Sequence, residues 1–126
     1  MDYASFTKPT VLIIDEEFNH QNNLKEIFDM LGFNTLTVNR NKEGVNLFTT
    51  YNDNIDLVFV HNTEPEKNGT STLKKLKKVD PEIKILCMNE YKHEVDTEDQ
   101  DFNNIGFIDT PVTMEHLIKG LNDVTK

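Results

Sequence analysis

Short apolar segments alternate with amphipathic segments along most of this sequence, and this order limits the folds that the chain can adopt. Residues 11–14 form a continuous apolar run, as expected for a strand buried on both faces of a sheet, and residues 55–60 are expected to form a second buried strand. Because strands and helices follow each other through short connections, the pattern predicts a parallel sheet with right-handed crossovers and helices on both faces. The other expected strands are residues 34–38, which alternate like a strand near a sheet edge, 83–88 and 105–108.

The expected helices each present one apolar face. In the first, Gly32 is the expected helix stop, and in the last, Thr113 is the expected N-cap. The apolar positions are Leu24, Ile27, Phe28 and Leu31 in the first helix, and Leu117, Ile118, Leu121 and Val124, all expected to point inward, in the last.

The segment of residues 69–79 is expected to be a helix with a lysine-rich outer face. Leu73, Leu76 and Val79 mark its apolar side, and Pro81 ends it. We interpret the lysines as a solvated face; they are Lys74, Lys75, Lys77 and Lys78. A further helix within residues 93–104 is expected to be short and frayed, because that segment is acidic and has few apolar residues.

Charge and composition exclude several classes of function. The formal net charge of −9 argues against binding to nucleic acid or anionic lipid, although it leaves room for a basic protein partner. Cys87 is the only cysteine and lies in an apolar run, so we expect a buried structural thiol without a disulfide. With neither a signal peptide nor an apolar run of transmembrane length, a cytoplasmic location is expected. The 126 residues fit a single domain over residues 1–126, and the oligomeric state stays open.

Polar residues follow the expected strands at the sheet edge where α/β proteins place their sites. Asp15 and Glu16 follow the first strand, and such a carboxylate pair can hold Mg²⁺. His61 follows the third strand, Asn89 the fourth, and Asp109 the fifth. Because no glycine-rich turn follows the first strand, the sequence lacks a backbone cradle for a phosphate or nucleotide there.

In these motifs the sequence resembles the receiver domain of two-component response regulators over nearly the whole chain. Residues 11–17, VLIIDEE, resemble the opening strand with its acidic pair. Residues 56–61, with Pro65 and Gly69, resemble the third strand and its loop, and residues 107–111, FIDTP, resemble the end of the fifth strand with its cis-peptide position. The resemblance implies a CheY-like, flavodoxin-like α/β fold, a doubly wound (βα)5 domain with five parallel strands in the order 2-1-3-4-5.

The departures from the family pattern concern the phosphorylation site. The resemblance implies three residues that this sequence replaces. In the family, an aspartate that accepts phosphate stands at the position of His61, a serine or threonine at the position of Asn89, and a lysine at the position of Thr110. Only the acidic pair remains, as Asp15 and Glu16. We therefore interpret the pocket as a degenerate phosphoacceptor site.

His61 admits several hypotheses. Nearby carboxylates favour an imidazolium ion, so a protonated His61 is expected to replace the missing lysine charge. Alternatively, His61 itself accepts phosphate, or it binds Zn²⁺ or Mn²⁺ together with Asp15 and Glu16. The remaining histidines, His20, His93 and His116, are expected to be solvated.

The leading hypothesis is a non-enzymatic pseudo-receiver, a protein-interaction module in a phosphorelay pathway. The resemblance implies a partner surface on the fourth helix, fifth strand and fifth helix, where the acidic segment 94–101 favours a basic partner. Phe107 occupies the position of the aromatic residue whose rotamer, in the family, reports phosphorylation. We expect its ring to be buried, because phenylalanine has no hydroxyl group that could form a hydrogen bond in an outward rotamer. The alternatives are an active but atypical phosphoacceptor and a flavodoxin-like redox or nucleotide-binding protein, against which the missing phosphate loop argues.

Overall fold

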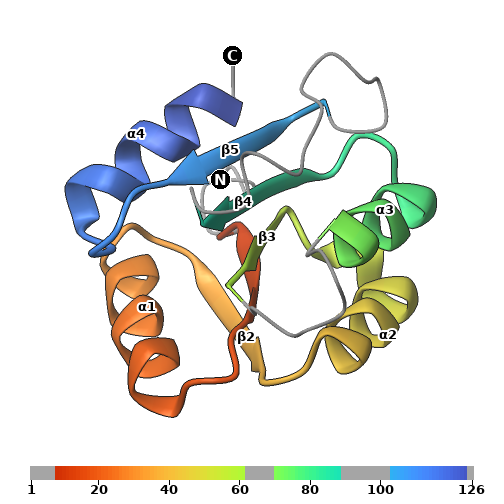
Figure 1. Ribbon diagram of the computed structural model, residues 1–126, viewed down its shortest axis with the longest axis horizontal. Coiled ribbons are helices and arrows are strands. Elements are labelled where there is room, and N and C mark those ends of the chain that lie inside the picture. The colour runs from red at the N-terminus through yellow and green to blue at the C-terminus, as the bar shows by residue number, and fades with distance from the viewer. Residues whose placement is uncertain (1–7, 62–69, 89–102, 125–126) are drawn as a thin grey trace, which may run out of the picture.

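The computed structural model describes residues 8–61, 70–88 and 103–124, which form one five-stranded parallel sheet with helices on both faces. The strand order is β2-β1-β3-β4-β5, as predicted. In Figure 1, α1 and α4 lie on one side of the sheet, and α2 and α3 lie on the other. The elements are β1 (Thr10–Ile14), α1 (Phe18–Met30), β2 (Asn34–Val38), α2 (Asn41–Tyr51), the 3₁₀ turn η2 (Asn52–Asn54), β3 (Leu57–Val60), α3 (Thr70–Val79), β4 (Lys84–Met88), β5 (Ile105–Ile108) and α4 (Met114–Val124).

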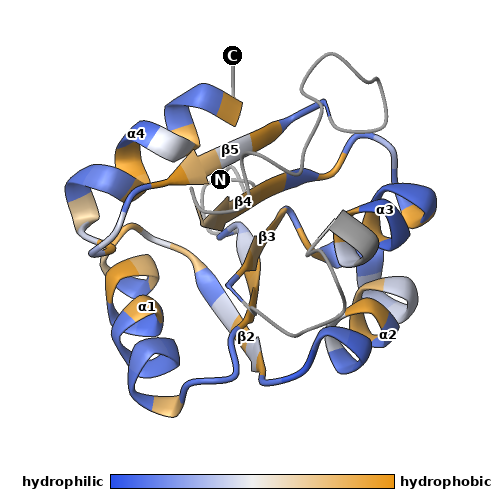
Figure 2. Ribbon diagram, in the orientation of Figure 1, coloured by the Kyte–Doolittle hydropathy of each residue, from blue (hydrophilic) through white to orange (hydrophobic). Residues whose placement is uncertain are grey.

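The core is formed by the central strands and by the inward faces of the helices. Every residue of β3 is buried, whereas β2 at the sheet edge is largely exposed, as the two sequence patterns predict. Figure 2 shows the same contrast as apolar colouring along β3 and β4 and polar colouring on the outer helix faces. The sheet thus positions the polar groups that follow β1 and β3 on a rigid base.

Local signals end and start the helices where the sequence predicts. Gly32 adopts a φ of +92° just after α1, and the amide of Phe33 donates to the carbonyl of Phe28 at 2.9 Å, which satisfies a terminal carbonyl of the helix. Before α4, the hydroxyl of Thr113 accepts a hydrogen bond from the amide of His116 at 3.1 Å. In α4 itself, Leu117 and Val124 are buried, but Ile118, expected inside, is 42% exposed.

The lysine face of α3 is not fully solvated, so that prediction was wrong for Lys77. Lys74, Lys75 and Lys78 are exposed, whereas Lys77 is only 5% exposed. Lys77 lies four residues after Leu73, on the helix face that packs on the core. Its ammonium group donates to the carbonyl of Ile83 at 2.5 Å and to that of Pro81 at 3.4 Å. Burial lowers the pKa of Lys77 to about 8, although attraction to Glu82 and Asp80 opposes this shift.

Cys87 is a buried free thiol in β4, as predicted, and burial raises its pKa to about 12. The expected helix and the acidic segment within residues 93–102 lie outside the described residues. Among the helices of the described ranges, none has the length and apolar character needed to cross a membrane.

Candidate functional site

Asp15 is the centre of a polar cluster at the carboxyl end of the sheet. It directly follows β1, and its side chain is fully buried. Its amide donates to the carbonyl of Val38 in β2 at 3.0 Å, and its Oδ1 accepts the amide of Glu17 at 2.9 Å. These bonds fix the position of the carboxylate within the turn that leads into α1.

His61 lies against Asp15, as the strand-end positions predict. Its amide donates to the carbonyl of Ile14 at 2.9 Å, which continues the pairing of β3 with β1 by one residue. The imidazole Nδ1 lies 3.2 Å from Oδ1 of Asp15. The hypothesis that a protonated His61 replaces the charge of the missing lysine stays a prediction, but the contact that it requires is present.

His20 is the site residue that the sequence analysis missed. It was expected to be solvated, yet its Nδ1 hydrogen-bonds to Oδ2 of Asp15. The two imidazole rings also contact each other, with centroids 4.2 Å apart and an angle of 35° between their planes. One signal was available in the sequence: a helix that starts directly after a strand end places the residues of its first turn beside that strand end.

The two histidines determine the ionisation of Asp15. Burial alone would raise the pKa of this carboxyl group, because the charged form loses hydration. Hydrogen bonds from His61, His20 and the amide of Glu17, together with the attraction of His61, outweigh this effect and hold the pKa of Asp15 below its ordinary value. Asp15 is therefore an ionised carboxylate in a buried position.

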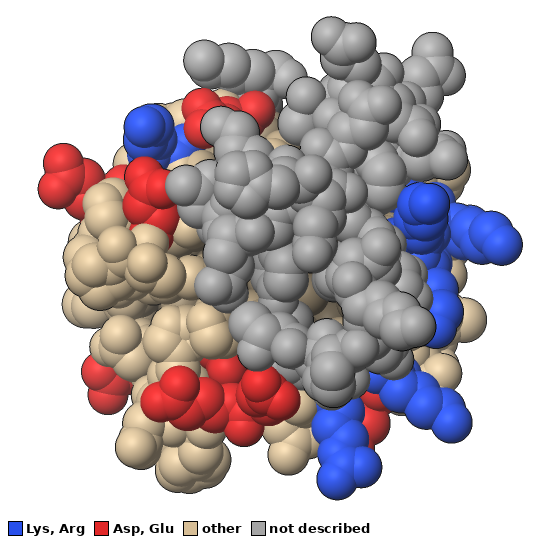
Figure 3. Space-filling model, in the orientation of Figure 1, with Lys and Arg blue, Asp and Glu red and all other residues tan. Residues whose placement is uncertain are grey.

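Glu16, the second member of the acidic pair, is exposed beside this cluster. Asp15 and Glu16 line a small hollow of about 190 Å³ together with Gln21, whose side-chain amide donates to the carbonyl of Val38 at 3.0 Å. Figure 3 shows acidic side chains gathered over the region where β1 leads into α1, whereas lysine and arginine side chains lie over α3 and the start of α2. The assignment of Asp15 and Glu16 as metal ligands stays a prediction.

The other predicted pocket residues are less closely tied to Asp15. Thr110 is exposed, and its peptide bond to Pro111 is cis, as the resemblance implies. Asn89, with His93 and residues 62–69, lies outside the described residues. His116 is only partly exposed, contrary to expectation, because its Nδ1 lies 2.8 Å from the carbonyl oxygen of Pro111 and 3.1 Å from that of Asp109.

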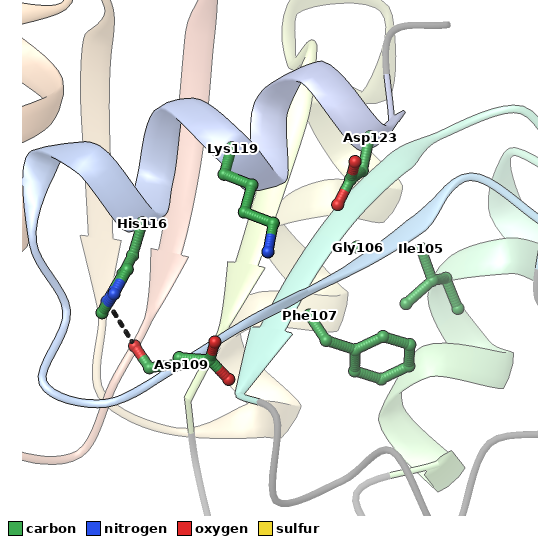
Figure 4. Close-up of a pocket in the computed structure, with 7 residues that line it drawn as sticks. All are labelled: Ile105, Gly106, Phe107, Asp109, His116, Lys119 and Asp123. Atoms are coloured by element: carbon green, nitrogen blue, oxygen red, sulfur yellow. Dashed lines mark hydrogen bonds between the residues drawn. The ribbon is translucent and has the colours of Figure 1, made fainter.

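Phe107 is partly buried, so the expectation of a buried ring is met only in part. It packs against the core from β5 and also borders a hollow of about 310 Å³ between β5 and α4. Figure 4 shows Lys119 and Asp123 projecting from α4 toward β5, the strand that carries Phe107. The remaining lining residues are Ile105, Gly106, Asp109 and His116.

Comparison with known proteins assigns the family. The sequence matches the response regulator receiver domain over residues 11–122, so the chain belongs to that family of two-component signalling domains. It is 34% identical over 67 residues to the transcriptional regulatory protein CpxR of Klebsiella pneumoniae, a match that covers 53% of this chain and 28% of CpxR. It is 27% identical over 119 residues to the two-component response regulator 24 of Arabidopsis thaliana, covering 92% of this chain and 84% of that protein.

Solved structures support the fold assignment. The chain aligns with the CheX–CheY–BeF₃–Mg²⁺ complex of Borrelia burgdorferi at a TM-score of 0.82 and 22% identity, covering 100% of this chain and 96% of that one. A response regulator receiver domain of Clostridium thermocellum aligns at a TM-score of 0.78 and 23% identity, covering 93% and 94% of the two chains. The family match favours a receiver over the flavodoxin-like redox or nucleotide-binding alternative.

Proposed function

We propose that this receiver domain acts in two-component signalling as a protein-interaction module that does not use aspartate phosphorylation. The observation that carries the proposal is the position of His61. It follows β3 directly, where the family resemblance implies the acceptor aspartate, and it contacts Asp15 at 3.2 Å. In this view the domain is a non-enzymatic, cytoplasmic pseudo-receiver.

The chemistry of phosphoryl transfer supports this proposal. A carboxylate acceptor attacks the phosphorus atom while a metal ion and a fixed cation neutralise the developing charge. In this chain, both oxygens of the Asp15 carboxylate already accept hydrogen bonds from imidazoles. Thr110, at the position of the family's lysine, has no charge to contribute. The pocket is therefore organised around internal hydrogen bonds between its own side chains.

The proposed partner surface includes the face formed by β5 and α4. Here α4 (Met114–Val124) is the last helix of the described residues, which corresponds to the fifth helix of the family pattern. The hollow between these elements is bordered by an aromatic ring, Phe107, and by charged groups of both signs, Lys119 and Asp123. Such a mixed surface suits recognition of a protein more than recognition of nucleic acid or a membrane. The net charge of −9 also disfavours binding to nucleic acid or to an anionic membrane. The acidic segment 94–101 favours a basic partner.

The proposal is tested by incubating the protein with a small-molecule phosphodonor and Mg²⁺, followed by intact mass measurement. The expected result is no phosphoryl adduct, and an unchanged amide NMR spectrum on addition of beryllofluoride and Mg²⁺, since beryllofluoride requires a carboxylate acceptor. A receiver with an intact acceptor aspartate, treated in parallel, shows that the donor is active. A phosphoryl adduct on the wild-type chain contradicts the proposal.

One specific alternative is phosphorylation of His61 itself. In that case the adduct appears on the wild-type chain, is lost in His61→Gln and is labile in acid. The proposal predicts that wild type and His61→Gln remain equally free of phosphate.

A further inference from the structure

Three potential metal ligands meet at the carboxyl end of the sheet. Asp15, His20 and His61 each offer one ligand atom, and these atoms all lie within 4.8 Å of one another. Nδ1 of His61 is 3.2 Å from Oδ1 of Asp15. Ligand atoms at about 2.1 Å from a tetrahedral Zn²⁺ ion are separated by about 3.4 Å, so the distance between His61 and Asp15 is close to that of two ligands in one coordination shell.

We propose that Asp15, His20 and His61 form a binding site for a divalent transition-metal ion, with Zn²⁺ as the best-fitting ion. Two imidazole nitrogens and one carboxylate oxygen are the donor set of many open zinc sites. Imidazole ligands suit Zn²⁺ and its neighbours in the first transition row. Three protein ligands leave a fourth coordination position for water or for a group supplied by a partner.

This donor set does not fit the Mg²⁺ ion that the family's acidic pair implies. Mg²⁺ requires octahedral oxygen coordination, and it is held by carboxylates and waters. Here the residue after β3 supplies nitrogen, and both carboxylate oxygens of Asp15 face imidazole rings. His20, which is outside the family's acidic pair, adds a second nitrogen. The histidine at position 61, in place of the family's acceptor aspartate, thus changes the preferred metal in addition to removing the acceptor.

The site combines a rigid ligand with accessible ones. The Asp15 side chain is 0% exposed and is fixed by the amide of Glu17, whereas the side chains of His20 and His61 are 21% and 20% exposed. An ion can therefore reach the rings from solvent while the carboxylate remains in place. Each ring that now donates through Nδ1 moves its proton to Nε2 or to solvent when Nδ1 binds the ion, so its lone pair becomes available.

The three ligands come from three different elements, which gives binding a structural consequence. Asp15 directly follows β1, His20 lies in the first turn of α1, and His61 directly follows β3. A bound ion links α1 to the sheet and stabilises the folded chain by mass action. Metal binding at this site does not depend on the proposed function.

Isothermal titration of the metal-free chain, produced without added histidines, tests the proposal. We expect one Zn²⁺ per chain with a dissociation constant on the order of 1 μM or lower, accompanied by a rise in thermal stability. Co²⁺ bound in place of Zn²⁺ is expected to give the visible absorption of a tetrahedral ion. Mg²⁺ at the same concentrations is expected neither to bind nor to displace Zn²⁺.

Two variants identify the ligands. His20→Gln and His61→Gln each keep a hydrogen-bond donor for Asp15 but remove the imidazole, and each is expected to weaken Zn²⁺ binding by about 100-fold or more, beyond the cost of losing an outer-shell group. The matched control is His116→Gln, a histidine on α4 that lies outside the cluster, and it is expected to leave affinity and stoichiometry unchanged.

Unchanged Zn²⁺ affinity in both cluster variants, or no Zn²⁺ binding below about 100 μM in the wild type, overturns the proposal. Competition by Mg²⁺ at equal concentration overturns it as well. The phosphodonor assay separates this outcome from the fate of the proposed function. An inert wild-type chain that binds no Zn²⁺ contradicts only the metal site, and a phosphorylated chain that binds Zn²⁺ contradicts only the proposed function.

Discussion

Asp15 and Lys77 are both buried, ionisable side chains, but they lie at opposite ends of the parallel sheet. Asp15 follows the carboxyl end of β1, whereas the amine of Lys77 contacts the carbonyl of Ile83, directly before the start of β4. The partners of Asp15 include two imidazoles from α1 and from the end of β3. The partners of Lys77 are backbone carbonyls four and six residues further along the chain.

The two environments differ in what they can do chemically: Asp15 belongs to a candidate functional site, whereas Lys77 makes a structural contact. Backbone carbonyls only accept hydrogen bonds, and every residue type provides one. Lys77 therefore only connects the end of α3 to the turn that follows it. The groups around Asp15 can ionise, transfer protons and ligate metals, and they are assembled only when β1, β3 and α1 are packed together. The two residues are therefore expected to respond differently to substitution and to pH.

The largest effect is expected for Asp15→Asn in the presence of a chelator. The change leaves imidazole and amide donors facing an uncharged group, and removal of one partner from a buried charged cluster costs about 3 kcal/mol of unfolding free energy. Urea unfolding measures the loss. The matched control is Glu16→Gln, an exposed neighbour that is expected to change stability by less than about 0.5 kcal/mol. Equal stability of Asp15→Asn and wild type would show that the carboxylate does not organise the cluster.

A second effect, which depends on pH, is expected for Lys77→Met. The pKa of Lys77 is about 8 in the folded chain, below the value of about 10.4 in the unfolded chain, so the unfolded state binds more protons between these two pH values. The stability of the wild type relative to Lys77→Met therefore rises as the pH increases from about 8 to 10.4, by on the order of 3 kcal/mol. It falls again as the pH returns to 8.

Chemical unfolding at several pH values measures this relative stability. Lys78→Met is the matched control, because Lys78 is exposed one residue further along the same helix. A difference between wild type and Lys77→Met that stays constant over this pH range would contradict the burial of the amine.

The smallest effect is expected for the exposed pair Lys25–Asp29 on α1, which serves as a baseline for the two buried groups. Its nitrogen and oxygen are 3.3 Å apart, and the two side chains are 50% and 48% exposed. Lys25→Ala is expected to change the unfolding free energy by less than about 0.5 kcal/mol, because solvent and salt screen such a pair. A loss comparable to that of Asp15→Asn would mean that burial does not explain the difference between the regions.

Most of the fold follows from hydrophobic patterns that are local in the sequence. The fully apolar run of β1 and the alternating β2 predict their places in the centre and at the edge of the sheet, because burial on two faces or on one leaves different patterns. The contact of Asp15 with His61 is also predictable, because parallel strands bring their carboxyl ends to one edge.

Two errors, at Lys77 and His20, concern side chains whose position depends on how a helix is rotated against the sheet. Lys77 was assigned to the outer face of α3 by its charge, although its spacing from Leu73 places it inside, where its aliphatic stem packs and its amine reaches carbonyls. His20 was assigned to solvent, although the first turn of α1 directs it back to Asp15. Phe107 is only partly covered, because β5 at the edge of the sheet borders a hollow rather than solid packing.

The buried thiol of Cys87 can be used to measure how often the sheet opens to solvent. With a pKa of about 12 and no exposed surface, this sulfur is unreactive toward alkylating reagents as long as β4 remains within the sheet. Its rate of labelling at neutral pH therefore reports how often the sheet opens to solvent. The same measurement, which needs no introduced cysteine, can show whether an ion bound at the carboxyl end of β1 slows that opening.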